Sequence, residues 1–211
     1  MHVGDAQLTG SVLAVGALGA LVGVARSLLR IDERSIPRVA LVSSAFFAIS
    51  LWHLPLPIPG TSIHLVLLGL LGLMLGRDTF LAVGVVLFFQ AFLLGHGGVT
   101  TIGVNTLAMS LPGPILARLC RPLICSNLSR CIGLGGFLLG FGSVLFACLL
   151  ISAAYLASQR AFLGYLPAYF LANLPLMLVE GWLTASATLF LSRVRPETIG
   201  RSLSMTPLEE S

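Results

Sequence analysis

The first two residues of the chain bring together three nitrogen atoms that can bind one metal ion. These atoms are the amine of Met1, the backbone amide nitrogen of His2 and a ring nitrogen of the His2 imidazole. The amine and the amide close one chelate ring, and the amide and the imidazole close a second. Nitrogen ligands in one plane suit Ni(II) and Cu(II), and Co(II) is a further candidate. The alternative is that this histidine is accidental and lies in an unstructured terminus.

A second histidine is a candidate for the position in this plane that the terminus leaves empty. His64 ends the segment Pro57-Ile-Pro-Gly-Thr-Ser-Ile-His64, whose two prolines and glycine should hold the backbone rigid. A rigid backbone is what a ligand-presenting loop needs. Taken alone, however, a histidine of this kind is more often a hydrogen-bonded core residue than a metal ligand.

Other polar side chains could orient such ligands through hydrogen bonds. His96, Thr101 and Asn105 belong to one glycine-rich loop. Glu180 is the only acidic residue inside an apolar run, and a carboxylate within a membrane segment indicates a functional site. Its structural alternative is a hydrogen bond to Thr184 or to the backbone of a loop.

Signals for catalysis are weak by comparison. The three cysteines between residues 120 and 131 are spaced unlike paired zinc ligands, and the sequence contains no Walker A, His-Glu-x-x-His or Gly-x-Ser-x-Gly motif. We therefore predict that the protein is not an enzyme. Two alternatives stay open: an intramembrane metal-dependent hydrolase that uses His64, His96 and Glu180, and a stand-alone metal permease.

The composition indicates where these residues must act. Of the 211 residues, 56% are hydrophobic and only 9% are charged, and the mean hydropathy is +0.99. A soluble domain is about 25% charged, so this chain has too few charges to cover a water-facing surface. The composition excludes a soluble enzyme and a protein that binds nucleic acid. It predicts an all-α integral membrane protein embedded in the lipid bilayer.

Seven apolar runs are candidate transmembrane helices. They are Leu8–Leu29, Val39–Leu54, Ile63–Leu75, Thr79–Leu94, Thr106–Leu119, Ile132–Ser158 and Ala161–Leu191. With the N-terminus outside, every arginine except Arg160 falls on the cytoplasmic side, as the positive-inside rule requires. We thus predict a bundle of about seven transmembrane helices with a cytoplasmic C-terminus. Residues 1–195 would form one membrane-embedded domain, and residues 196–211 a short polar tail.

Small residues four apart in the first run permit close contact between helices. The pairs are Gly16 with Ala20 and Gly19 with Gly23. One interpretation is packing within the bundle, and the other is docking of a second membrane subunit against this helix.

Four segments of the chain together resemble one known family. They are Met1-His-Val with Asp5, the segment from Pro57 to His64, the segment Gln90–Asn105, and Glu180-Gly-Trp-Leu-Thr184. They are similar to the nickel/cobalt substrate-binding membrane subunit of energy-coupling-factor ABC transporters, the CbiM/NikM family. The resemblance runs from Met1 to about Arg195. Asp5 and Ser62 lie in the matching segments and join the residues expected to support the metal ligands.

The resemblance implies a seven-helix bundle that binds a metal in a square plane through the Met1 amine, the His2 amide and ring, and the His64 ring. The metal, Ni(II) or Co(II), would be the transported substrate, and no organic cofactor is implied. The implied partners are a membrane coupling subunit, cytoplasmic ATPase subunits and a small accessory membrane subunit, all in a prokaryotic plasma membrane. Gly4 stands where the family commonly has proline, which leaves the path of the terminus and the choice of metal open.

Overall fold

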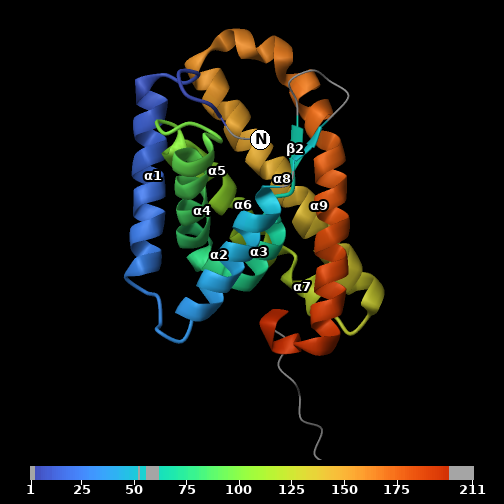
Figure 1. Ribbon diagram of the computed structural model, residues 1–211. Coiled ribbons are helices and arrows are strands. Elements are labelled where there is room, and N and C mark those ends of the chain that lie inside the picture. The colour runs from blue at the N-terminus through green and yellow to red at the C-terminus, as the bar shows by residue number, and fades with distance from the viewer. Residues whose placement is uncertain (1–2, 52, 56–61, 200–211) are drawn as a thin grey trace, which may run out of the picture.

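The protein is a helical bundle with one short hairpin (Figure 1). The computed structural model describes residues 3–51, 53–55 and 62–199, and for residues 53–55 and 62–64 it describes the backbone alone. The α-helices are α1 (Gly10–Leu28), α2 (Ile36–Ser50), α3 (Leu68–Leu75), α4 (Thr79–Leu94), α5 (Ile102–Ser110), α6 (Pro112–Leu119), α7 (Arg121–Ile124), α8 (Ser129–Ser158) and α9 (Leu166–Val194). The 3-10 turns are η1 (Gly76–Asp78), η2 (Arg160–Tyr165) and η3 (Pro196–Ile199), and the strands β1 (His53–Pro55) and β2 (Ser62–His64) pair antiparallel.

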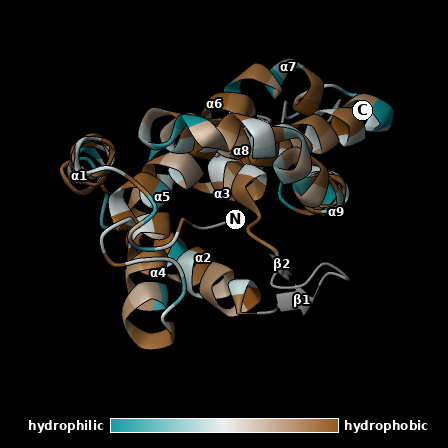
Figure 2. Cartoon of the chain, turned by 90° about the horizontal axis from the view of Figure 1, so that it is seen from above, coloured by the Kyte–Doolittle hydropathy of each residue, from teal (hydrophilic) through white to brown (hydrophobic). Residues whose placement is uncertain are grey.

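Many large apolar side chains are exposed on the outside of the bundle. Figure 2 shows that the helices consist mainly of hydrophobic residues. Leu18 is 64% exposed, Phe92 58% and Trp182 70%. Four segments are long and apolar enough to cross a bilayer, namely Gly10–Leu28, Leu68–Leu94, Ser129–Ser158 and Arg160–Val194. The prediction of a mainly helical membrane protein is confirmed. The count of seven crossings and the orientation of the termini stay predictions.

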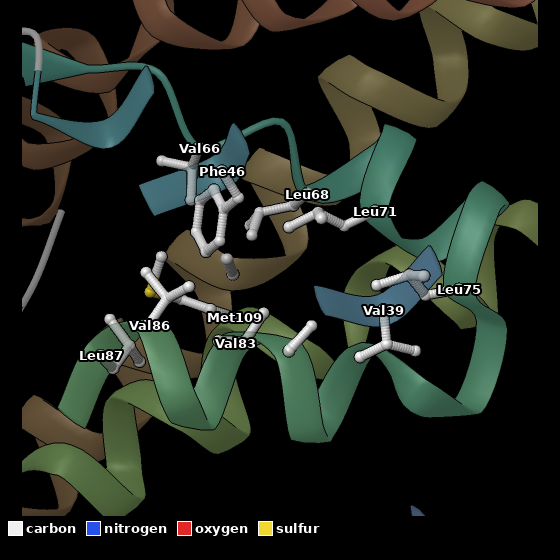
Figure 3. Packing of buried hydrophobic residues seen from close by; sticks show 12 residues of the cluster. Val39, Phe46, Val66, Leu68, Leu71, Leu75, Val83, Val86, Leu87 and Met109 are labelled. Atoms are coloured by element: carbon white, nitrogen blue, oxygen red, sulfur yellow. The ribbon is translucent and has the colours of Figure 1, made fainter. Parts of the chain in front are cut away.

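One of these four segments, Leu68–Leu94, changes direction in its middle. Gly76 has φ 55° and ψ −121°, which interrupts the helix between Leu75 and Thr79. In Figure 3, the side chains of α3 from Leu68 to Leu75 run in one direction and those of α4 from Val83 to Leu87 run in the opposite direction. The chain therefore reverses at η1, where the sequence predicted a boundary between two apolar runs.

The structure differs from the predicted helix boundaries at several of the apolar runs. The run Val39–Leu54 is helical only to Ser50, because His53 and Leu54 belong to β1 of the hairpin. The run Ile63–Leu75 is helical only from Leu68, because the hairpin takes up the start of this run and Leu67 has a left-handed backbone with φ 50°. The run Thr106–Leu119 is split between α5 and α6 at Pro112, which has no backbone N–H to continue the helix. By contrast, α9 continues through Pro175 without a break.

Buried apolar residues of five helices, including Ala147 of α8, form a core next to the hairpin (Figure 3). It contains Phe46 of α2, Leu71 of α3, Val86 of α4 and Met109 of α5, together with Val66 from the segment after β2. The buried side chain of Val66 thus packs the segment that follows His64 against these helices.

The small residues of α1 face other helices of the same chain. A Cβ atom at Gly16 would overlap Val104 of α5, and one at Gly23 would overlap Phe80 of α4. A Cβ atom at Gly19 would lie 3.0 Å from Leu107, and Ala20 is buried. Packing within the bundle therefore accounts for the stripe, and docking of a partner on it stays a prediction.

Candidate metal site

The predicted metal ligands lie at the edge of what the structure describes. Met1 and His2 lie outside the described residues, and only the backbone of His64 is described. That backbone is the last residue of β2 and pairs with His53 of β1. The surroundings of these ligands, however, are described on both sides.

The residue that follows His2 is held inside the bundle by three hydrogen bonds. Val3 is fully buried, and its N–H donates to Oδ1 of Asn105 over 3.0 Å. Its carbonyl oxygen accepts from Oγ1 of Thr101 at 2.7 Å and from Nδ2 of Asn105 at 3.0 Å. Both backbone polar groups of Val3 are therefore satisfied by side chains of the loop and helix that the sequence singled out. The N-terminal segment is anchored at a position directly next to the predicted chelate.

Asp5 fastens the same segment to the start of the glycine-rich loop. Its carboxylate accepts the N–H of Val99 at 3.2 Å, and the N–H and hydroxyl of Thr100 at 2.9 and 2.5 Å. These bonds, the Thr100 hydroxyl first, lower the pKa of Asp5 below its ordinary value. A Cβ atom at Gly98 would meet the backbone N of Asp5 at 2.6 Å, so a glycine there lets the two segments approach.

Glu180 holds the backbone of the segment after His64 in a similar way. It lies in the middle of α9, is fully buried, and its Oε1 accepts the N–H of Val66 at 2.5 Å and the N–H of Leu67 at 2.7 Å. This is the loop-backbone alternative that the sequence left open. The Thr184 hydroxyl and the second carboxylate oxygen have no partner among the described residues. The carboxylate therefore fixes the backbone two and three residues beyond His64.

Close packing of α8 against α9 determines where the Glu180 carboxylate lies in the bundle. A Cβ atom at Gly140 of α8 would lie 2.8 Å from the carbonyl carbon of Glu180 and 2.6 Å from Oγ1 of Thr184. Only glycine allows the two helices to cross this closely, so the position of Glu180 depends on Gly140.

Two other predicted supporting residues have different surroundings. His96 is exposed, and its backbone N–H donates to the carbonyl of Gln90 at 3.0 Å, at the end of α4. Ser62 takes part in the hairpin, opposite Pro55.

Additional anchors of the N-terminal segment were missed by the sequence reasoning. Gln7 accepts a hydrogen bond from the hydroxyl of Tyr155, and its carbonyl accepts from Nε2 of Gln159 at 3.2 Å. The N–H of Thr9 donates to Oγ of Ser158 at 3.0 Å. These pairs are 148 to 152 positions apart, and no local pattern marks them.

Side chains in the described ranges do not assemble a metal site by themselves. No group of three or more His, Cys, Asp or Glu residues that could hold an ion occurs there. What the described residues form is a frame around the predicted ligands: Asn105, Thr101 and Asp5 on the side of the terminus, and Glu180 on the side of His64.

One protein-family model matches nearly the whole chain. The CbiM family model, described as a cobalt uptake substrate-specific transmembrane region, matches residues 2–198. The chain belongs to this family. Among its relatives is a putative metal transport protein of Haemophilus influenzae, 27% identical over 96% of this chain and 98% of that protein. A cobalt transport protein CbiM of Sorangium cellulosum is 33% identical over 78% of this chain and 76% of that protein.

Two further likenesses concern assembly and fold. A putative fused cobalt transport protein CbiMQ of Methanocorpusculum labreanum is 28% identical over 89% of this chain, which spans 33% of that longer protein. A crystal structure described as a truncated transition metal transporter has a TM-score of 0.68 at 22% identity, over 93% of this chain and 99% of that one. Membership of the CbiM family, whose relatives are named as transport proteins, confirms the prediction that the protein is not an enzyme.

Proposed function

We propose that the protein binds Ni(II) or Co(II) outside the cell and presents the ion for import. The ligands are the Met1 amine, the His2 amide and ring, and the His64 ring, arranged in one plane. Membership of a cobalt uptake family and the names of the relatives support a divalent metal as the cargo. The metal is the transported substrate, and the protein needs no organic cofactor for this role.

The observation that carries the proposal is the double anchoring of the predicted ligands. Asn105 and Thr101 hold Val3, the residue after His2, while Glu180 holds the two backbone amides that follow the His64 segment. Figure 1 shows β2 and the start of α5 at the same end of the bundle. A metal site needs ligands whose positions are fixed by supporting hydrogen bonds, and the frame supplies them from both directions.

The metal affinity of the proposed chelate should depend on pH. An α-amine titrates near pH 8 and must lose its proton to bind the metal, as must the amide nitrogen of His2. Metal affinity is therefore expected to fall in acid.

Four nitrogen ligands in a plane favour Ni(II), whereas the family name and the relative from Sorangium favour cobalt as the cargo.

The proposal includes the arrangement in the membrane. Residues 1–195 form one domain of seven crossings with the N-terminus outside, and 196–211 form a cytoplasmic tail whose first residues pack as η3, with Ile199 buried. The arginine distribution supports this orientation in the plasma membrane of a prokaryote.

The proposed partners are a membrane coupling subunit, cytoplasmic ATPase subunits and a small accessory membrane subunit. A relative in which the matching region is one part of a longer fused CbiMQ protein supports a membrane partner. Import would then need these partners and ATP, which distinguishes the protein from a stand-alone permease.

Metal binding by purified protein tests the proposal directly. We expect His2→Ala and His64→Ala each to weaken nickel and cobalt binding strongly in equilibrium dialysis, since each removes one ring nitrogen. His96→Gln changes the histidine of the glycine-rich loop, to which the proposal gives a supporting position and not a ligand position. A loss in His96→Gln as large as that in His64→Ala would contradict the proposed ligand set.

A further inference from the structure

A cavity of about 810 Å³ lies between α1, α3, α6 and η3. Its lining includes Arg26 and Arg30, which lie where α1 finishes, at the end of the bundle opposite to β2 (Figure 1). The volume falls in the range of cavities that hold small organic ligands, roughly 300–1,000 Å³. None of the residues of the proposed metal site lines it.

The charge of this cavity is almost entirely positive. Its lining includes six exposed arginines, which are Arg26, Arg30, Arg38, Arg77, Arg118 and Arg121. The acidic lining residue is Glu197, which pairs with Arg195 over 3.4 Å. The nearby Asp78 is buried and accepts a hydrogen bond from Ser27 at 3.0 Å. Such a cavity repels a divalent cation, so it does not serve the metal, and it attracts an anion with phosphate-like oxygens.

The remaining wall of the cavity is apolar and is open to the surroundings of the bundle. Val22 of α1 is 48% exposed and Ile115 of α6 is 40% exposed, and Leu107 of α5 lies against Gly19 of α1. Gly19 and Gly23 also line the cavity, where the apolar side chains of Leu107 and Phe80 pack against them. The cavity thus combines guanidinium groups at the end of α1 with an apolar groove along that helix.

We propose that this cavity binds an anionic glycerophospholipid, with its phosphate among the arginines and an acyl chain along Val22 and Leu107. A soluble phosphate would use the arginines and leave the apolar groove unfilled. A lipid satisfies both parts, because basic pockets between membrane helices attract anionic headgroups and the groove faces the bilayer. Charge complementarity and the exposed apolar wall therefore favour the same occupant.

Native mass spectrometry of the full chain in mild detergent tests this proposal. Dioleoylphosphatidylglycerol and dioleoylphosphatidylcholine carry the same acyl chains and differ in headgroup charge. We expect the wild type to retain the anionic lipid preferentially. The variant Arg26→Gln/Arg118→Gln should bind phosphatidylglycerol about 25-fold more weakly, because each arginine near a charged lipid surface contributes a few-fold to affinity.

A matched variant separates the cavity from charge in general. Arg34→Gln/Arg193→Gln removes the same charge from arginines that do not line the cavity and should retain the wild-type preference. Equal retention of the two lipids by the wild type, or an equal loss in both double variants, would overturn the proposal. The first outcome would leave the arginines for an acidic protein partner.

A soluble competitor distinguishes the lipid from a free phosphate. We expect glycerol 3-phosphate at the same concentration to leave bound phosphatidylglycerol in place, whereas complete displacement would assign the cavity to a soluble anion and refute the lipid. The thermal midpoint of Arg26→Gln/Arg118→Gln in detergent should equal that of the wild type. That equality shows that the variant is folded, and it keeps this test independent of the proposed metal site.

Discussion

The carboxylate of Glu180, in the middle of α9, accepts a hydrogen bond of 2.7 Å from the backbone N–H of Leu67, a residue 113 positions earlier in the chain. Leu67 has a left-handed backbone, with φ 50°, at the point where the extended segment after β2 becomes helix α3. The bond therefore fixes the exit of the His64 segment in a conformation that non-glycine residues rarely adopt. We therefore expect α9 to position the proposed metal site without contributing a ligand to it.

Removing this carboxylate should weaken metal binding and destabilise the fold. Glu180→Ala leaves the buried N–H of Val66 and the partly buried N–H of Leu67 without an acceptor, at a cost of about 2 kcal/mol in the free energy of unfolding. Glu180→Gln keeps an oxygen acceptor and should lie between the wild type and the alanine variant. Thermal unfolding and nickel titration measure the two effects. Glu197→Ala, at an exposed ion pair, is the control, and unchanged nickel affinity in Glu180→Ala would contradict a positioning role.

Asn105 should support the ligands on the N-terminal side of the proposed metal site. Asn105→Ala removes the acceptor of the Val3 N–H and one donor to the Val3 carbonyl, so the N-terminal segment loses its position. We expect nickel affinity to fall by roughly 10- to 100-fold, the range found when support of a metal ligand is lost. Thr106→Ala, the next residue of α5, is the control: its buried hydroxyl has no partner among the described residues. Equal affinity of Asn105→Ala and the wild type would separate the anchoring of Val3 from metal binding.

Asp5 makes a pH-dependent contribution to the order of the glycine-rich loop. Its pKa is lowered by the bonds from Thr100 and Val99, so the ionised carboxylate stabilises the loop above the ordinary pKa of aspartate. This stabilisation is lost as the pH falls through the lowered pKa. In hydrogen exchange, the amide of Thr100 should therefore exchange faster in Asp5→Asn than in the wild type at pH 7. The difference should disappear in strong acid, and a difference that persists there would contradict the assignment.

Gly140 is expected to tolerate no side chain. Even the methyl group of Gly140→Ala would overlap Glu180 and Thr184, and overpacking of this kind costs about 1–3 kcal/mol. Gly164→Ala is the control, since a Cβ atom there meets nothing within 4 Å. The thermal midpoint in detergent should fall for the first variant and stay unchanged for the second. An equal midpoint for both would show that α8 and α9 can separate without penalty.

Much of the helical architecture was predictable because local chemistry sets its boundaries. The run Thr79–Leu94 coincides with α4, which ends where Gly95 adopts a left-handed backbone with φ 62°. Thr101 and Asn105 were also identifiable as polar side chains of the glycine-rich loop, and Asp5 through the family resemblance. The role found for them is to hold the backbone of the N-terminal segment and of its loop.

The remaining features depend on contacts that no local pattern encodes. The pairing of His53 with His64 in the hairpin, where the sequence predicted the end of one helix and the start of the next, follows from the approach of two chain segments. The hydrogen bond between Tyr155 and Gln7 joins the end of α8 to the N-terminal segment. An apolar run indicates that a segment avoids water, either inside the protein or against lipid. It does not indicate whether the backbone of that segment is extended or helical.

The most direct measurement of the central claim uses one chain with its first nitrogen covered and then exposed. A removable fusion ahead of Met1, cut by a protease that leaves Met1 as the first residue, provides both forms with identical membrane segments. Nickel binding is followed by calorimetry and by visible absorption before and after the cut. The account predicts no tight binding in the fused form and, after release, one ion per chain in a yellow, diamagnetic complex typical of four nitrogens in a plane. Tight binding of equal strength in both forms would contradict a chelate built on the terminal amine.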